Sequence, residues 1–258
     1  MIPHVSCSTL LRYCSGDSLA QIAWDRAHPP EPTPAMVLGS LVHCLVLEGD
    51  EIFDDRYITS AGIDRRTKAG REQYAALAGS GKTIIAPNMA DQARVIARTI
   101  CAQPAIARLL VAASRETTLD WHRDDRQCYG TGRLDALSLE HGAVVDLKVT
   151  GLVAYPARER AILGGIYRQL AFYRQLARAN GLGVDAGIVV FACSTPPYEV
   201  VPVALPESVL SVGWMDMDTA WKAIDADWAA ENYRPHTSEL EEFVPPEWFL
   251  RRHFYNTL

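Results

Sequence analysis

Two strand-like segments joined by a short turn limit the possible folds of this chain more than any other feature. They cover residues 127–139 and 143–150, and a turn that contains a glycine separates them. In the second segment polar and apolar residues alternate, so Asp146 and Lys148 share one face of the strand and the apolar side chains share the other. Antiparallel pairing of the two segments sets Asp135 opposite Asp146, or within one residue of it.

This pairing predicts a metal site. Two carboxylates at that separation repel each other unless a cation joins them, and hard oxygen ligands suit Mg²⁺ or Mn²⁺. Lys148 lies on the same patch and is placed to contact a phosphate or an attacking water. The residues therefore indicate a metal-dependent phosphodiesterase. A plainer interpretation stays open at this point, because Asp-Leu-Lys at the end of a strand is a common string whose charges are often solvated.

The charge of the chain limits where a nucleic acid can bind. A formal net charge of −6 is unusual for a protein that contacts phosphates, so any basic surface must be local, such as a channel. The densest basic run lies between Ile63 and Arg71 and contains Arg65, Arg66 and Lys68. This run is either a phosphate-binding segment or the solvated start of a helix.

The sequence indicates neither a disulfide framework nor a membrane span. The six cysteines are scattered without CxxC spacing, and no run approaches the ~20 apolar residues of a membrane-spanning helix. The N-terminus carries no basic-then-apolar signal sequence. We therefore expect a soluble, cytoplasmic protein with reduced cysteines and no contact with a membrane.

The N-terminal part, residues 1–110, is predicted to be mainly helical. The expected helices are Val5–Trp24 with a break near Gly16, Pro34–Leu47 with Thr33 as N-cap, and Asn88–Leu110 with a break at Pro104. Between the first two helices, residues 28–34 hold four prolines and must be extended. A polar segment over residues 50–80 and a short strand over residues 82–86 precede the third helix.

The middle part, residues 111–205, is predicted to form a catalytic sheet and helix. A strand over Glu116–His122 joins the two strands of the hairpin in an antiparallel meander. A helix over Ala157–Asn180, expected to be the longest, leads to a buried strand over Asp185–Cys193, and this order favours a parallel crossover. An edge strand over Tyr198–Val203 follows. Residues 206–258 are expected to form a C-terminal helix and a tail, so that residues 1–258 make one α/β domain.

Helical spacing brings two further pairs of side chains together. Gly39 and His43 are four residues apart on one face of the second helix, and Gln169 and Tyr173 have the same spacing on the longest helix. His43 is either a hydrogen-bonded core histidine or a metal ligand. Gln169 and Tyr173 either satisfy each other in the core or reach together to a phosphate. Glu116 is either a further oxygen ligand or an exposed residue at the start of a strand.

In chain order these residues resemble the PD-(D/E)XK nuclease superfamily. The ordered set is Gly39 with His43, Glu116, Asp135, Asp146-Leu147-Lys148, and Gln169 with Tyr173. The chain is more closely similar to the RecE-type exonucleases (exodeoxyribonuclease VIII) of phages and prophages, and to the nuclease domain of RecB. Two N-terminal segments resemble sequences that are typical of the same family: Pro32-Thr33-Pro34-Ala35 and Asp64-Arg65-Arg66-Thr67-Lys68. Arg133-Leu134-Asp135 lacks the proline that gives the superfamily the P of its name. That proline is not a metal ligand.

The resemblance implies a restriction-endonuclease-like core with a mixed central β-sheet, and it implies a role for each residue of the set. Asp135, Asp146 and the Leu147 carbonyl would hold Mg²⁺, or Mn²⁺ in its place, and His43 and Glu116 would complete one or two metal positions. Lys148 would act in catalysis, and Gln169 and Tyr173 would orient the phosphate or the water. The DNA would be held by Arg65, Arg66, Lys68 and Arg133. Because no cysteine follows Cys193, no iron–sulfur cluster is expected.

The implied activity is a metal-dependent 5′→3′ exonuclease that acts on double-stranded DNA ends in phage-type homologous recombination. Proteins of this type form ring-shaped homo-oligomers and work with a single-strand annealing protein. Two alternatives stay open. One is an endonuclease or single-strand nuclease that uses the same site, and the other is a DNA-end-binding module whose site is silent.

Overall fold

The computed structural model describes residues 4–230, 244, 245 and 247, and its main sheet is built on the predicted hairpin. Strands β5 (Tyr129–Ser138) and β6 (Ala143–Thr150) pair antiparallel, with Ser138 opposite Ala143 and Ala136 opposite Val145. The turn ends at Gly142, whose φ of +55° suits glycine and whose N–H donates to the carbonyl of Leu139 at 3.2 Å. The predicted hairpin and its register are therefore confirmed.

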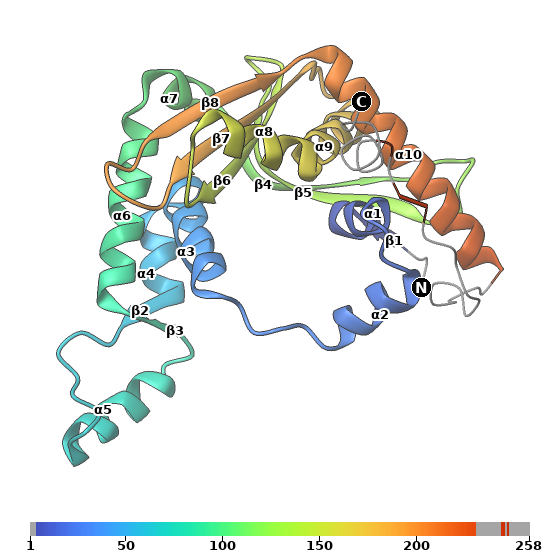
Figure 1. Cartoon of the computed structure of the whole chain (residues 1–258). Helices are drawn as coiled ribbons and strands as arrows, with labels where there is room; N and C mark the ends of the chain where they lie inside the picture. Colours follow the sequence, from blue (N-terminus) through green and yellow to red (C-terminus); the bar gives the residue numbers. More distant parts are fainter. Residues whose placement is uncertain (1–3, 231–243, 246, 248–258) are drawn as a thin grey trace, which may run out of the picture.

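The other strands of the main sheet give it a mixed topology (Figure 1). Strand β4 (Ser114–Trp121) runs antiparallel to β5 from Gly130 to Leu137 and completes the predicted meander. Strand β7 (Ala186–Cys193) lies parallel to β6, and β8 (Val200–Leu205) pairs antiparallel with β7 at the edge of the sheet. These pairings confirm the mixed sheet and the parallel crossover.

A fork divides the sheet between β5 and β6. Because β4 occupies one edge of β5, both β1 (His4–Ser6) and β6 pair with the other edge. Strand β1 pairs with the first residues of β5, and the β5–β6 ladder extends no further than Ala136 and Val145. Asp135 and Asp146 are the next residues on the two strands, so both lie where the strands separate.

Helices cover both faces of the sheet (Figure 1). One face packs against four helices, which are α1 (Cys7–Cys14), α2 (Leu19–Ala27), α9 (Tyr167–Ala179) and α10 (Glu207–Ala229). The opposite face packs against α3 (Pro34–His43), the π-helical turn η1 (Cys44–Glu48), α4 (Asp50–Arg56), α6 (Pro87–Ala102) and α7 (Pro104–Val111). The apolar face predicted for β6 belongs to the second core, where Val145 and Leu147 are buried.

An arm projects from the second helical layer (Figure 1). Strands β2 (Tyr57–Thr59) and β3 (Thr83–Ile85) form a separate parallel pair, and the arm between them carries α5 (Lys68–Ala78). Residues 57–59 had no predicted element, whereas β3 confirms the predicted short strand.

Two predicted helices are wrong in their extent. The helix predicted from Val5 starts later, because residues 4–6 form β1, whereas its predicted break near Gly16 is confirmed: Gly16, with a φ of +100°, separates α1 from α2. The helix predicted over Ala157–Asn180 is broken into α8 (Tyr155–Ala161), the π-helical turn η2 (Ile162–Ile166) and α9, since Gly165 has a φ of +147°. The longest described helix is instead α10, with 23 residues.

The start of α3 follows the prediction. The Thr33 hydroxyl accepts a hydrogen bond from the Met36 N–H at 3.3 Å, and Pro34 is the first helical residue. No described helix is long and apolar enough to cross a membrane. Most of the predicted C-terminal tail lies outside the described residues.

Candidate active site

Three potential metal ligands converge at the fork. His43 from the end of α3, Glu116 from β4 and Asp135 from β5 each offer a ligand atom, and these atoms lie within 4.8 Å of one another. Each of the three side chains is partly buried. Asp135 Oδ2 accepts a hydrogen bond from the N–H of Leu147 at 2.8 Å, which fixes the carboxylate across the fork.

The hydrogen bonds of His43 leave one ring nitrogen free to act as a ligand. Nε2 lies 2.8 Å from the carbonyl oxygen of Leu147, and because a carbonyl only accepts, Nε2 carries the proton. Nδ1 lies 3.6 Å from Asp135 Oδ2. Burial is the main cause that lowers the pKa of His43, so the ring is neutral and Nδ1 presents a lone pair to a carboxylate. Two facing acceptors with no proton between them suit a cation.

Glu116 reaches the group from a strained backbone position. Its φ is +49°, a region that costs an ordinary residue on the order of 1 kcal/mol or more. The carboxylate lies 2.8 Å from Nε of Arg133, which is itself largely exposed. Of the two orientations considered for Glu116, the structure therefore places the carboxylate at the site.

Asp146 lies beside the three ligands but outside their compact group. Its Oδ1 accepts hydrogen bonds from Lys148 Nζ at 3.1 Å and from Gln169 Nε2 at 2.8 Å. Its Oδ2 lies 2.8 Å from Lys148 Nζ, yet the geometry of a hydrogen bond is not met there, and this buried oxygen has no other partner among the described residues. A buried carboxylate oxygen without a hydrogen bond is available to a metal ion.

Burial shifts the pKa values of the two aspartates and the lysine at the fork. It raises the pKa of Asp135 and of Asp146 above the ordinary aspartate value, and the charge of Asp135 adds to the rise at Asp146. Burial works against the charged form of Lys148, but the Asp146 carboxylate outweighs it and raises the pKa of the lysine. Lys148 is therefore an ammonium ion that donates, and it cannot serve as a base at neutral pH.

The predicted Gln169 and Tyr173 pair lies behind Asp146. Gln169 donates to the carboxylate of Asp146 and, at 3.3 Å, to the hydroxyl oxygen of Tyr173. Tyr173 packs against Gly132, where an added Cβ would lie 2.9 Å from the ring, so this position needs glycine. The pair thus holds Asp146 in place, and neither residue lines the cavity described next.

Sequence reasoning missed Cys7 as a member of this network. The buried Cys7 thiol lies beside Tyr173 and Asp146, and burial, followed by the charge of Asp146, raises its pKa. A single cysteine at the start of a helix carries no spacing signal that connects it to a strand far along the chain. Only the pairing of β1 with β5 brings it to the fork.

A polar cavity of about 590 Å³ opens onto the group. Its lining includes His43, Glu116, Arg133, Leu147 and Lys148, and it extends along α3 past Gly39. Arg56 and Tyr57 also line it and had no predicted role. The predicted DNA-contacting residue Arg133 therefore does lie at the site.

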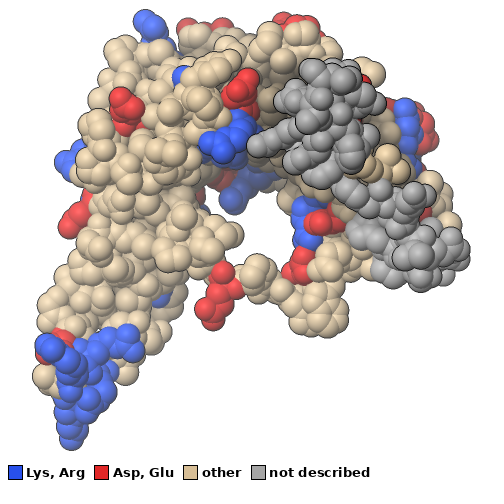
Figure 2. Space-filling view, viewed as in Figure 1, with Lys and Arg blue, Asp and Glu red and all other residues tan. Residues whose placement is uncertain are grey.

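The other predicted DNA-contacting residues lie elsewhere. Arg65, Arg66 and Lys68 belong to the arm around α5, where basic side chains gather at the tip (Figure 2). Arg66 pairs with Asp64 at 2.9 Å, and Arg65 stacks 4.2 Å from the ring centre of Tyr74. None of the three lines the cavity. They form a separate basic surface.

Comparison with known proteins identifies the family and the fold. The family model of a PDDEXK-like domain of unknown function (DUF3799) matches residues 5–239. A crystal structure of a "Putative exonuclease" from Eubacterium rectale is similar with a TM-score of 0.61 and 13% sequence identity, over 97% of this chain and 93% of that chain. A phage-related exonuclease from Haemophilus somnus gives a TM-score of only 0.40 at 12% identity, over 90% of this chain and 97% of that chain. No curated protein matches the chain significantly.

The low identities show a shared fold and nothing finer. The family match extends over most of the chain and includes every strand of the main sheet except the first residue of β1. The predicted superfamily and the restriction-endonuclease-like fold are therefore confirmed, and the chain belongs to the PDDEXK-like family DUF3799.

Proposed function

We propose that this protein is a metal-dependent 5′→3′ exonuclease that shortens double-stranded DNA from its ends. The observation that carries this proposal is the convergence of His43, Glu116 and Asp135 at the fork, next to a buried Asp146 and the Lys148 ammonium. The PDDEXK-like family and the fold shared with the Eubacterium rectale protein support a nuclease. Polarity, duplex preference and a role in phage-type recombination come from the resemblance to RecE-type exonucleases.

The donor set fits a divalent cation. Two carboxylates and an unprotonated imidazole nitrogen converge, and nearby lies the Oδ2 of Asp146, which forms an ion pair with Lys148 but accepts no hydrogen bond among the described residues. Oxygen-rich sets of this kind suit Mg²⁺ or Mn²⁺. A bound cation would supply Lewis-acid stabilisation of the phosphate and a more acidic water. The Leu147 carbonyl, which was predicted to be a ligand, accepts a hydrogen bond from His43, so it would also fix the orientation of that ring.

The protein's own residues would divide the remaining work. Lys148 lines the cavity, and its ammonium would hold a phosphate oxygen, where it would neutralise charge that grows during hydrolysis. Gln169 and Tyr173 would keep Asp146 in position from behind. Arg133 at the cavity rim would contact the DNA backbone, and Arg65, Arg66 and Lys68 on the arm would contact the duplex further from the site.

End-labelled linear duplex DNA tests this function. With Mg²⁺ or Mn²⁺ we expect progressive shortening from the 5′ end, no product in EDTA, and no product from Asp146→Asn protein that still binds DNA. A linear duplex that stays intact with either metal would overturn the proposal. A covalently closed circle separates the endonuclease alternative, which would cut it. Binding to ends without product in both proteins would instead favour the silent binding module.

Two further features of the proposal concern partners. A ring-shaped homo-oligomer and a single-strand annealing partner are inferred from the family resemblance alone. Size-exclusion chromatography with light scattering tests the first, and a monomer at working concentration would contradict it.

A further inference from the structure

One wall of the active-site cavity has no role in the chemistry proposed above. This wall, called the α4 wall here, is formed by Glu48, Arg56 and Tyr57. Glu48 ends η1, Arg56 ends α4 and Tyr57 begins β2. The same cavity is lined by the metal-binding residues of β4 and α3 and by Lys148. The α4 wall therefore borders the space that a DNA strand bound at the fork would enter.

Arg56 brings an oriented cation to the α4 wall. Its Nη1 donates to Glu48 Oε1 at 2.6 Å, while 52% of the Arg56 side chain is exposed. A guanidinium carries five N–H groups in a planar fork, so others remain for the oxygens of a phosphate. Glu48 offsets the charge of Arg56, and the wall would therefore bind a phosphate through directed hydrogen bonds more than through net charge.

Tyr57 adds a hydroxyl whose capacity for hydrogen bonding is unused. Its ring centre lies 5.1 Å from that of the buried Phe53, and its hydroxyl forms no hydrogen bond with another described residue. Burial is the main cause that raises the pKa of Tyr57, and the guanidinium of Arg56 lowers it by less. The phenol is therefore protonated at neutral pH, and it lies close to Arg56 with a proton to donate.

Ion pairs and a hydrogen bond hold the α4 wall in place. Arg94 of α6 pairs with Asp50 at 2.5 Å and with Asp54 at 2.9 Å, and it lies 4.8 Å from the ring centre of Phe53. Lys82, where the arm returns to the body, donates to the carbonyl oxygen of Asp54 at 2.7 Å. Since β2 starts the arm, both ends of the arm are attached at this wall.

The position of the α4 wall gives the direction of the bound strand. Figure 1 places β2 and β3 between α4 and α5, so a strand that leaves the fork over Arg56 runs towards the basic tip of the arm (Figures 1 and 2). The tip is proposed to contact duplex, so this part of the strand is still paired. For a 5′→3′ exonuclease the paired part lies on the 3′ side of the scissile phosphate.

We propose that Arg56 and Tyr57 bind the phosphate directly 3′ of the scissile phosphate and so set the register of the substrate strand. This inference rests on the proposed 5′→3′ nuclease function and adds a subsite for the strand that is still in duplex. The two side chains do not touch the reacting atoms, so they are positioning residues. Their loss should slow cleavage without changing the Mg²⁺ concentration needed for half-maximal activity.

A neutral phosphate replacement tests the contact. A methylphosphonate has a methyl group in place of one charged oxygen, and it is placed in a linear duplex one linkage 3′ of the bond to be cleaved. Cleavage of that bond is measured in a single turnover with excess protein. The parent should cleave the modified duplex about tenfold more slowly, because it loses hydrogen bonds to a charged group. Arg56→Gln should cleave unmodified duplex about tenfold more slowly than the parent and should lose less than about threefold on modification. Tyr57→Phe, which keeps the ring, should show the same pattern with smaller losses.

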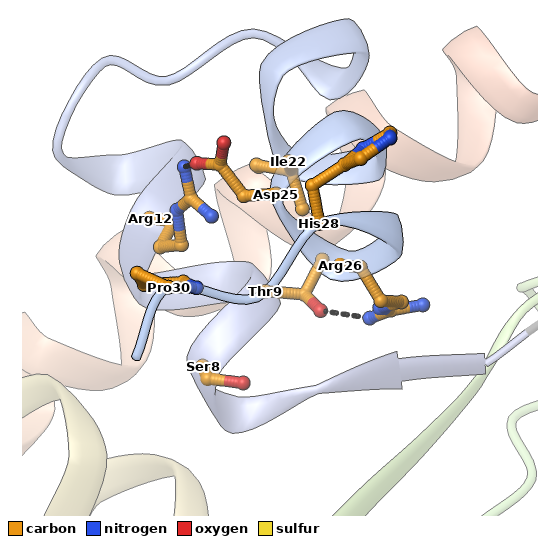
Figure 3. A pocket seen from close by; sticks show the side chains of 8 residues that line it. All are labelled: Ser8, Thr9, Arg12, Ile22, Asp25, Arg26, His28 and Pro30. Carbon is orange, nitrogen blue, oxygen red and sulfur yellow. Dashed lines mark hydrogen bonds and ion pairs between the residues drawn. The ribbon is translucent and has the colours of Figure 1, made fainter. Parts of the chain in front are cut away.

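An arginine of another cavity provides a matched control. Arg26 lines a second cavity of about 450 Å³, where it donates to the Thr9 hydroxyl at 2.8 Å (Figure 3). It does not line the active-site cavity. Arg26→Gln should therefore keep the full sensitivity to the methylphosphonate. A methylphosphonate one linkage 5′ of the bond should slow the parent and Arg56→Gln by the same factor.

Each outcome decides the proposal. A parent that the 3′ methylphosphonate does not slow, or Arg56→Gln with undiminished sensitivity to it, would overturn the subsite. Sensitivity that Arg56→Gln loses at the 5′ linkage instead would overturn the direction. A parent that cleaves no DNA would refute the nuclease function, and the affinity for linear duplex would then decide on the subsite. Binding about tenfold weaker in Arg56→Gln would support it, and unchanged binding would overturn it.

Discussion

Asp135→Asn should make the metal-free protein more stable at neutral and alkaline pH. The Asp135 carboxyl is 17% exposed, and burial is the largest of the causes that raise its pKa from 3.8 to about 6. A rise of the pKa from 3.8 to about 6 corresponds to about 3 kcal/mol lost from the free energy of unfolding once the folded carboxyl is charged. Asparagine keeps an oxygen for the Leu147 N–H and carries no charge. We therefore expect the substitution to increase the free energy of unfolding by about 1–3 kcal/mol at neutral and alkaline pH.

The dependence on pH gives the sign of this effect. The pKa of Asp135 is higher in the folded state than in the unfolded state. The protonated carboxyl therefore contributes fully to the stability of the parent protein below about pH 4, and this stability is lost as the pH rises through about 6. The advantage of the variant should be largest at about pH 8 and should shrink below 1 kcal/mol near pH 4. Urea unfolding in EDTA, followed by circular dichroism at both pH values, measures it.

Added metal should reverse the comparison. Mg²⁺ or Mn²⁺ stabilises only a folded protein that retains its ligands, so the parent should gain stability at about pH 8 and Asp135→Asn should gain much less. If Asp135→Asn is less stable than the parent at about pH 8 in EDTA, the buried charged carboxylates do not destabilise the metal-free protein, and the reasoning is refuted.

Three other variants test single roles. Glu116→Gln should raise the Mg²⁺ concentration needed for half-maximal DNA cleavage about tenfold or more while sparing the rate at saturating metal, and an unchanged metal titration would exclude Glu116 as a ligand. Lys148→Ala should lower kcat about 10²–10³-fold with little change in that metal concentration, and a loss under tenfold would exclude its role in stabilising charge. Removal of both Arg65 and Arg66 should reduce the slope of log K against log salt by about 2 in duplex binding, whereas an unchanged slope would show that the arm makes no phosphate contact.

The local pattern of the sequence was sufficient to predict most of the sheet. Alternation and a glycine-containing turn specify β5 and β6 together with their register, because a slip of one residue would expose the buried face of β6. Strand β1 has only three residues, too few for any periodicity, so its residues were predicted as part of a helix. The break within the helix predicted over residues 157–180 was missed because apolar spacing continues through Gly164 and Gly165.

The candidate site was predictable in its members but not in its geometry. Asp135 and Asp146 follow from strand pairing, Lys148 follows from the alternation of the second strand, and the roles of His43 and Glu116 follow from the order of residues in the resembling family. That Gln169 bonds to Asp146, and that Arg65 stands on an arm away from the cavity, depends on packing between elements distant in sequence. The fork has no local signal, because it results from two strands that compete for one edge of β5.

The central claim is that His43, Glu116 and Asp135 bind one divalent cation. The most direct measurement is anomalous diffraction from crystals of the protein soaked in Mn²⁺. We expect an anomalous peak within bonding distance of His43 Nδ1 and of both carboxylates, and no peak in the same position in Asp135→Asn crystals. Fully occupied Mn²⁺ elsewhere, with these three side chains unliganded, would contradict the account.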